Sequence, residues 1–435
     1  MKNFTKMVGG CAIASFLILL SGCNFTTIHP FSNGGHERNM LVVMSDIHLG
    51  ANSSYAEIKA NLIPLQNILQ QIEASPNVKE LVLNGDIFDE WFVPANVDTY
   101  QGKDQADFMQ RIAATNSGVI NILNAVIQDK KIIVTYIPGN HDLTITEKNI
   151  DSILPGIHQA RDKQQGLGTY IPTDYPKTAI EHGHRYDFFC APDPISNQDI
   201  APGTILPPGY FYTRIAVLHV IQNPITTGDI PPNITQNISG DTNQKVAFLY
   251  WNIWNRALNT YPIANKFDEK IIVTNLDGFT GNYAINDILP YQTISDGTIS
   301  MKLYSGIQDT WDQRQLLNNV AIHTPVMQAI TNAGNGRALD DEAKNQYFLN
   351  PASDKRIIVF GHSHQPKIIT SQNTSGEKSI YANDGTWIDH NPLGSGRTFI
   401  VITPQDTNPS SQTFVRLYNF ENDVITEMAE EYLHY

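Results

Sequence analysis

The fold is decided by a nine-residue stretch at positions 40–48, MLVVMSDIH, in which an unbroken apolar run leads directly into a polar cluster. Five consecutive apolar residues are typical of a strand that is buried on both faces of a sheet. The residues at 81–86, LVLNGD, and at 132–140, IIVTYIPGN, repeat this arrangement of an apolar run with a polar end. We therefore predict three buried strands, each followed by a loop that carries polar side chains.

Apolar residues recur at helical spacing between these predicted strands, over Ile58–Ile72 and over Ile120–Ile127. The order strand, helix, strand, helix, strand implies βαβ units, a largely parallel sheet and an α/β fold. In such sheets functional residues gather at the carboxyl ends of the strands. We therefore expect a functional site where the polar clusters follow the strands.

The alternation of strands and helices stops after His184. From about 188 to about 354 the chain is rich in Pro, Asn, Gly and aromatic residues, with helical patterns at 210–221 and 246–258. The earlier order resumes with an apolar run at 357–360. This organisation predicts one catalytic body over 39–435, interrupted by an inserted cap at about 188–354. The aromatic residues of the cap have two interpretations, packing of the cap itself or lining of a substrate pocket.

Five polar clusters form the candidate site. In chain order they are Asp46-Ile47-His48, Gly85-Asp86-Ile87-Phe88-Asp89, Gly139-Asn140-His141-Asp142, His182-Gly183-His184 and Gly361-His362-Ser363-His364. One intervening residue places Asp46 and His48 on the same side of an extended segment, and the same holds for His362 and His364. Imidazole and carboxylate groups together suit Zn, Mn, Fe or similar divalent ions. The clusters therefore predict a metal site.

The order of these motifs resembles that of the calcineurin-like metallophosphoesterase superfamily, over about 39–389 without the insertion. The resemblance implies a layered βαβ sandwich that binds two divalent metal ions (Mn, Fe or Zn). It assigns Asp46, His48 and His364 to the first ion, Asn140, His182 and His362 to the second, and Asp86 to both. It also implies a metal-bridging hydroxide as the nucleophile, His141 as the proton donor, and Asp89 as the carboxylate that orients His141.

The activity implied by the resemblance is hydrolysis of a phosphoester. Protein phosphatases of the superfamily are disfavoured, because Glu90-Trp91 and Asp142 stand where they carry an arginine and a glutamate. The stretch 85–91 looks closer to the group of UDP-2,3-diacylglucosamine pyrophosphohydrolase, although the insertion here is longer and the fourth motif reads HGHRYD. The alternatives are therefore a pyrophosphohydrolase acting on a nucleotide-linked lipid or sugar, and a non-catalytic, metal-braced binding lipoprotein.

Arg185, directly after the fourth cluster, has two interpretations. Its planar guanidinium group could contact a substrate phosphate, or it could form a structural ion pair with Asp187 or another carboxylate.

The N-terminus resembles a bacterial lipoprotein signal. Two lysines precede an apolar run at 8–20, which ends in Leu20-Ser21-Gly22-Cys23, a sequence similar to the lipobox. This implies a signal peptide over 1–22, lipidation of Cys23, a tether over 23–38 and a location in the cell envelope. Asn24 favours the outer membrane. The alternative is an ordinary secretory signal with a chance cysteine.

The formal net charge of −14 argues against nucleic acid as a partner, since unassisted binding of nucleic acid needs a cationic surface. Cysteines are few, and two of the three precede residue 24, which argues against a disulfide-stapled scaffold. The third, Cys190, is interpreted as a small buried side chain without a chemical role.

Overall fold

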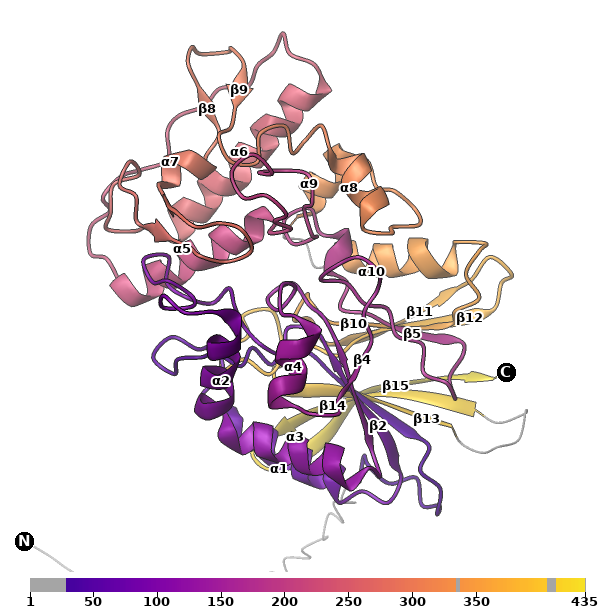
Figure 1. Ribbon diagram of the computed structural model, residues 1–435. Helices are drawn as coiled ribbons and strands as arrows, with labels where there is room; N and C mark the ends of the chain where they lie inside the picture. The colour runs from indigo at the N-terminus through magenta and orange to yellow at the C-terminus, as the bar shows by residue number, and fades with distance from the viewer. Residues whose placement is uncertain (1–28, 334–336, 405–411, 435) are drawn as a thin grey trace, which may run out of the picture.

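Two β-sheets packed face to face form the body of the protein (Figure 1). The computed structural model describes residues 29–333, 337–404 and 412–434. The first sheet has seven strands in the order β15-β14-β13-β1-β2-β3-β4, and the second has four in the order β11-β12-β10-β5. Leu41 and Val43 of the first sheet share one buried cluster with Ile357 and Val359 of the second, so the inter-sheet core lies directly beneath the predicted site.

The seven-stranded sheet is parallel in one half and antiparallel in the other. Its strands are β1 Met40–Met44, β2 Val78–Asn84, β3 Ile133–Ile137, β4 His158–Gln159, β13 Thr398–Pro404, β14 Gln412–Glu421 and β15 Val424–His434. Strands β1 to β4 pair in parallel, whereas β13, β14 and β15 join β1 as an antiparallel meander. The α/β prediction is confirmed, but the prediction of a largely parallel sheet is wrong for the C-terminal strands. Strands β14 and β15 are joined by only two residues, a connection too short for parallel neighbours.

The four-stranded sheet supplies the other strand ends that matter for the site. Its strands are β5 Thr178–Ile180, β10 Ile357–Phe360, β11 Lys367–Gln372 and β12 Lys378–Asn383. Strand β10 lies between β5 and β12 and pairs with both in parallel. The carboxyl ends of β5 and β10 therefore lie side by side, although 175 residues or so of chain separate the two strands.

Helices cover the outer face of the seven-stranded sheet. They are α1 Leu62–Glu73, α2 Gln105–Thr115, α3 Ser117–Asp129 and α4 Glu147–Ile153. Along β1 the side chains alternate between two cores: Val42 and Met44 join the cluster of Leu65 and Ile120 from the helices, whereas Leu41 and Val43 face the second sheet. Burial on both faces explains why this strand carries no polar residue.

The insertion folds as a mainly helical cap over the body (Figure 1). After the short 3-10 helix η1 His184–Tyr186 come α5 Pro208–Gln222, α6 Thr242–Thr260, α7 Ile285–Ile288, α8 Trp311–Leu317, α9 Val326–Asn332, α10 Arg337–Ala343 and η2 Lys344–Phe348. Two short hairpins, β6 Ile272–Val273 with β7 Asn282–Tyr283 and β8 Tyr291–Gln292 with β9 Ile299–Ser300, complete it.

A buried arginine fastens the cap to the body. Arg214 of α5 is fully buried and donates hydrogen bonds to the carbonyl oxygens of Val93 (3.3 Å), Pro94 (3.1 Å) and Val97, all in the loop after β2. A buried guanidinium group is costly unless its donors are satisfied, and these carbonyls satisfy them. The cap is thereby held at a fixed position next to the loop that carries Asp86 and Asp89.

Part of the predicted tether packs against the body. Phe31 is buried and its ring stacks on Phe399 of β13 at 5.4 Å. The predicted signal peptide over 1–22 and the predicted lipidation site Cys23 lie outside the described residues. Within the ranges that the structure describes, no helix has both the length and the apolar character needed to cross a membrane.

Candidate metal centre

All seven predicted ligands lie at the carboxyl ends of five strands. Asp46 and His48 follow β1, Asp86 follows β2, Asn140 follows β3, His182 follows β5, and His362 and His364 follow β10. The parallel pairing of β1 with β2 and β3, and of β5 with β10, brings these ends to one edge of the sandwich. Residues far apart in the sequence therefore meet at one place.

Asp46, His48 and His364 converge on one point. The Oδ1 atom of Asp46 lies 3.0 Å from Nε2 of His364, and the Nε2 atoms of His48 and His364 lie 3.4 Å apart. Asp46 Oδ1 is buried and accepts no hydrogen bond from any described residue. An orphaned carboxylate oxygen beside two imidazole nitrogens is the environment expected of a divalent cation site.

A second group converges beside the first. Nε2 of His182 lies 3.3 Å from Oδ2 of Asp86 and 3.2 Å from Oδ1 of Asn140. His362 belongs to the same group, since one ligand atom each from Asp86, His182 and His362 lies within 4.8 Å of the others. Asp86 Oδ2 is also 3.8 Å from Nε2 of His48, which places this carboxylate between the two groups.

The remaining ring nitrogens of two histidines are held by the protein. Nδ1 of His48 is 2.9 Å from Oδ2 of Asp89, and Nδ1 of His182 is 2.9 Å from the carbonyl oxygen of Asn84. A proton on each Nδ1 leaves each Nε2 with its lone pair facing the centre. Metal-binding histidines are usually oriented in this way, so the donor set and its support both fit divalent ions.

The backbone at the candidate ligands is strained. Five of them adopt a left-handed conformation with φ between 51° and 64°: Asp46, His48, Asp86, His362 and His364. This conformation costs non-glycine residues about 1–2 kcal/mol each, and such residues concentrate at functional sites. The neighbouring glycines are required by close packing, because a Cβ atom at Gly139 would collide with the carboxylate of Asp86.

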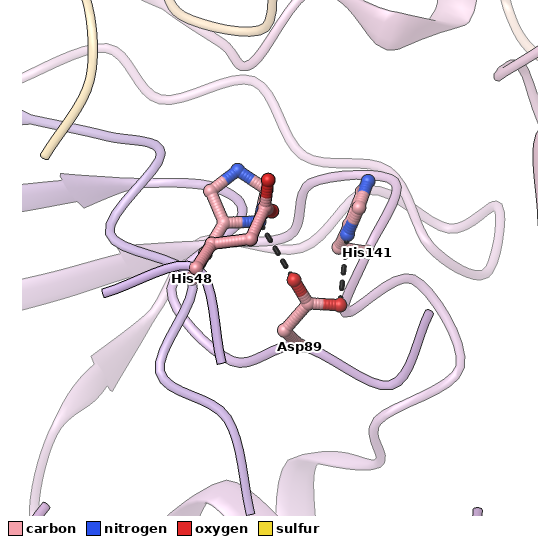
Figure 2. Close-up of side chains that lie close together, drawn as sticks. His48, Asp89 and His141 are labelled. Atoms are coloured by element: carbon pink, nitrogen blue, oxygen red, sulfur yellow. Dashed lines mark hydrogen bonds and ion pairs between the residues drawn. The ribbon is translucent and has the colours of Figure 1, made fainter. Parts of the chain in front are cut away.

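Asp89 connects two histidines, as Figure 2 shows. Its Oδ2 contacts His48, and its Oδ1 lies 2.8 Å from Nδ1 of His141 while also accepting the backbone N–H of Trp91 at 2.9 Å. Burial opposes protonation of His141, but the carboxylates of Asp89 and Asp86 outweigh it and raise the pKa of His141 above 6.5. The ring of Trp91 lies 4.9 Å from that of His141, so His141 is fixed by contacts from two sides.

Arg185 does not face the centre. Its guanidinium group is buried and forms ion pairs with Glu181 and Asp162, at 2.7 Å each, and Nη1 donates to the carbonyl oxygen of Asn318. The interpretation as a phosphate contact is therefore wrong. The structural interpretation is correct, with Glu181 and Asp162 as the partners instead of Asp187. These two carboxylates neutralise the positive charge of the guanidinium group, which is then not available to a phosphate.

Two carboxylates that the sequence analysis did not assign to the metal site lie at the centre. Oε2 of Glu57 is 3.2 Å from Nδ1 of His48, and Oδ2 of Asp187 is 3.3 Å from Nε2 of His362. The sequence could have indicated Asp187 as a site residue, since it ends the polar run that begins at His182. Glu57 carries no such signal, because it lies in a loop that follows no apolar strand.

A cavity of about 370 Å³ lies over the centre, between the body and the cap. Trp91, His141 and Asp86 line it from the body, and Tyr212 lines it from α5. The neighbouring Tyr210 and Phe211 are fully buried. Of the two interpretations of the cap aromatics, lining of a pocket therefore applies to Tyr212, and packing of the cap applies to Tyr210 and Phe211. Cys190 is half-buried and also lines the cavity, and burial raises the pKa of its thiol, which keeps it neutral.

Glu90, beside the site, gives a pH-dependent contribution to stability. It is fully buried, Tyr100 and Gln105 donate to its Oε1, and burial raises its pKa from 4.5 to about 7. The folded protein therefore keeps a proton that the unfolded chain loses above pH 4.5, so this contribution to stability falls between about pH 4.5 and 7. The shift from 4.5 to about 7 corresponds to a loss of about 3 kcal/mol in the free energy of unfolding, and we expect this loss to disappear in Glu90→Gln.

The check is a set of denaturant unfolding curves from pH 4 to pH 8 for the wild type, Glu90→Gln and the exposed control Glu147→Gln. Parallel stability profiles for the wild type and Glu90→Gln would contradict the shifted pKa of Glu90.

The comparisons with known proteins agree with the geometry over the first part of the body. The model of the family described as calcineurin-like phosphoesterase matches residues 40–205. This range holds β1 to β5 and four of the five polar clusters, whereas His362 and His364 lie beyond it, after the cap. No curated protein matches the chain. The match at 40–205, with the clusters of His and Asp, supports the metallophosphoesterase superfamily and indicates a metal-dependent phosphoester hydrolase.

Proposed function

We propose that the protein is a binuclear metal-dependent phosphoester hydrolase of the bacterial cell envelope. The observation that carries the proposal is the convergence of seven nitrogen and oxygen ligands from five separate loops, with the buried Asp46 Oδ1 facing Nε2 of His364 at 3.0 Å. In this proposal Asp46, His48 and His364 hold one ion, Asn140, His182 and His362 hold the other, and Asp86 contacts both.

The donor set suits Mn, Fe or Zn, since it combines imidazole nitrogens with carboxylate and amide oxygens. When bound, two such ions supply positive charge that activates water as a nucleophile and neutralises phosphate oxygens. Asn140 contributes a neutral oxygen, which leaves the site less anionic than a further carboxylate would. The protein's own task is then to orient the substrate and to handle the proton of the leaving group.

His141 is the proton donor of this proposal, and Asp89 positions it. The contact of 2.8 Å between Asp89 and Nδ1 fixes the ring, so that Nε2 is the nitrogen left to reach the substrate. The raised pKa of His141 keeps a proton available near neutral pH. Protonation of the leaving oxygen by a positioned imidazolium is general-acid catalysis.

The second candidate function is a pyrophosphohydrolase acting on a nucleotide-linked lipid or sugar. The aromatic lining by Trp91 and Tyr212 favours a substrate with an organic group, without choosing between an ester and a pyrophosphate. A non-catalytic binding lipoprotein is disfavoured, because His141 is held in place by Asp89 although this proposal assigns it to neither metal ion.

The experiment that tests this proposal is a substrate screen. The chain is treated with a chelator, reloaded with Mn, Fe or Zn, and assayed on phosphomonoesters, phosphodiesters and pyrophosphates. We expect hydrolysis that depends on the added metal. Release of a nucleoside monophosphate from a pyrophosphate, without cleavage of simple esters, would select the second candidate. Binding of metal with no hydrolysis of any substrate would leave the non-catalytic alternative.

Attachment to the membrane through a lipid on Cys23 gives a separate prediction. In Cys23→Ala we expect the protein to leave the membrane fraction or to stall before processing, since stable anchoring needs more than one acyl chain. The measurement is fractionation of cells followed by mass determination of the N-terminus. Cys11→Ala, which changes a cysteine inside the apolar run, is the matched control. A normally processed Cys23→Ala protein that stays fully in the membrane fraction would refute the lipid anchor.

A further inference from the structure

Two cavities meet at the candidate metal centre. The first, of about 370 Å³, extends beneath α5 and α6 and is called here the α6 arm. The second, of about 250 Å³, extends toward α9 and α10 and is called the α10 arm. Asp187, Ala333 and His362 line both. Beyond these shared residues, α5 and α6 line the first cavity and α9 and α10 line the second, so the two arms extend along different parts of the cap.

The α6 arm has an apolar and aromatic wall. Trp91 and His141 lie on its body side, and Phe189, Tyr212 and Ile253 lie on its cap side. Arg256, an exposed residue of α6, also lines this arm. Such a wall accepts a ring or an apolar group and excludes water from it.

Apart from Tyr186, the α10 arm is lined by smaller side chains than the α6 arm. Ala329 of α9, Ala338 and Leu339 of α10, and the exposed Leu393 form its apolar part. Glu342 lines it too, but its carboxylate is buried and accepts hydrogen bonds from Thr324 and Gln346. The alanines leave room beside His362 for a second organic group.

The charges around the two arms favour a phosphate with one negative charge. Among the described residues that line them, Arg256 is the one Lys or Arg side chain, whereas Asp187 and Glu342 are carboxylates outside the proposed metal ligands. Asp187 stands at the junction, 3.3 Å from Nε2 of His362. The second ionisation of a phosphomonoester has a pKa of about 6, so a monoester carries nearly two negative charges at neutral pH and a diester carries one. A carboxylate at the junction therefore repels a monoester more strongly.

We propose that the substrate carries an organic group on both sides of the reacting phosphorus and one negative charge on that phosphate. A phosphodiester has this arrangement, and so does each phosphate of a pyrophosphate diester. This inference rests on the proposed function and specifies its substrate class. One group lies in the α6 arm, the other lies in the α10 arm, and the phosphorus lies between them at the metal centre.

The position of His141 assigns the two groups. His141 lines the α6 arm but not the α10 arm, so the leaving group occupies the α6 arm and the retained group occupies the α10 arm. In hydrolysis water forms a new bond to phosphorus, the bond from phosphorus to the leaving oxygen breaks, and that oxygen takes the proton of His141 Nε2. A diester thereby gives a phosphomonoester and an alcohol, and the proton lost by water restores His141.

The test compares two substrates with the same leaving group. Bis(4-nitrophenyl) phosphate retains a nitrophenyl group, and methyl 4-nitrophenyl phosphate retains only a methyl group. The Mn-loaded full chain is assayed as wild type, as Ala338→Phe in the α10 arm, as Ile253→Phe in the α6 arm, and as Ala114→Phe on the exposed side of α2. The quantity compared is kcat/KM for bis(4-nitrophenyl) phosphate divided by kcat/KM for methyl 4-nitrophenyl phosphate. The intrinsic reactivities of the two substrates affect this ratio equally in every variant.

Ala338→Phe is expected to lower this ratio at least about tenfold, since exclusion of an apolar group from its pocket has an effect of that order. Ile253→Phe is expected to slow hydrolysis of both substrates by the same factor. Ala114→Phe is expected to slow hydrolysis of neither substrate. Leu393→Trp, at an exposed position of the α10 arm, gives the same test without a change in a packed helix. An unchanged ratio in both Ala338→Phe and Leu393→Trp would overturn the inference.

Further substrates distinguish a phosphodiester from a pyrophosphate diester. They also distinguish failure of this inference from failure of the proposed function. Cleavage between the phosphorus atoms of a nucleoside diphosphate sugar supports a pyrophosphate diester, and cleavage of the aryl esters alone supports a phosphodiester. Preference of the wild type for 4-nitrophenyl phosphate over both diesters would overturn the inference and leave the proposed function intact. Absence of metal-dependent hydrolysis of every substrate would overturn both.

Discussion

Asp86→Asn is expected to lose metal from both positions and to lower kcat/KM at least about 10³-fold, because it removes several kcal/mol of transition-state stabilisation. Asp86 is the carboxylate between the two groups, with Oδ2 at 3.3 Å from His182 and 3.8 Å from His48. Loss of its charge weakens both positions together, whereas loss of a peripheral ligand weakens one. The measurements are elemental analysis of the purified variant and steady-state kinetics on a chromogenic phosphoester.

Asp129→Asn, which changes an exposed carboxylate at the end of α3, is the control for the general effect of one lost charge. Two ions per chain and normal turnover in Asp86→Asn would contradict the assignment of Asp86 as the shared ligand.

His141→Ala is expected to retain both metals while turnover falls by about 10²–10⁴-fold, the usual contribution of a general acid. The side chain contacts Asp89 and Trp91 and is not part of either converging group around Asp46 or Asp86. The loss should be larger for an alkyl alcohol, which needs a proton to leave, and smaller for nitrophenolate, which departs with little need of one. Kinetics on the two substrate types, with metal analysis of the same sample, measure this difference.

His158→Ala, at an exposed histidine on β4, is the matched control. Equal losses on the two leaving groups would remove the proton-donor role and leave His141 as a charge-stabilising or structural residue.

The sequence was sufficient to predict the parts of the fold that repeat a strong local pattern. Strands β1 and β10 are unbroken apolar runs because both of their faces are buried, and α1 shows a clear apolar stripe because one of its faces is buried. Strand β15 was missed because it lies at the edge of the sheet, where exposure allows Glu427, Glu430 and Glu431. Its pairing with β14 depends on tertiary contacts that no local pattern records.

The candidate site was predictable where residue type and spacing carry the chemistry. Asp46, His48, His362 and His364 form short motifs at strand ends, and the structure brings them together with the other predicted ligands. The partners of Arg185 could not be predicted, since Asp162 reaches it through folding alone.

The sequence also does not reveal which side chains of the cap face the cavity. Aromatic spacing along α5 does not reveal which side chain faces the cavity: Tyr212 lines it, whereas the adjacent Phe211 is buried in the cap. This outcome depends on how α5 sits against the body, which the buried Arg214 determines through contacts with carbonyl oxygens 117 or more residues away in the sequence.

The most direct test of the account is a metal titration of the chelated protein. Mn is added in steps to the metal-free chain, and hydrolysis of bis(4-nitrophenyl) phosphate is measured together with bound metal. The account predicts no activity without metal and full activity when two ions are bound per chain. Full activity in the metal-free chain, or activity that reaches its maximum with one ion bound per chain, would contradict it.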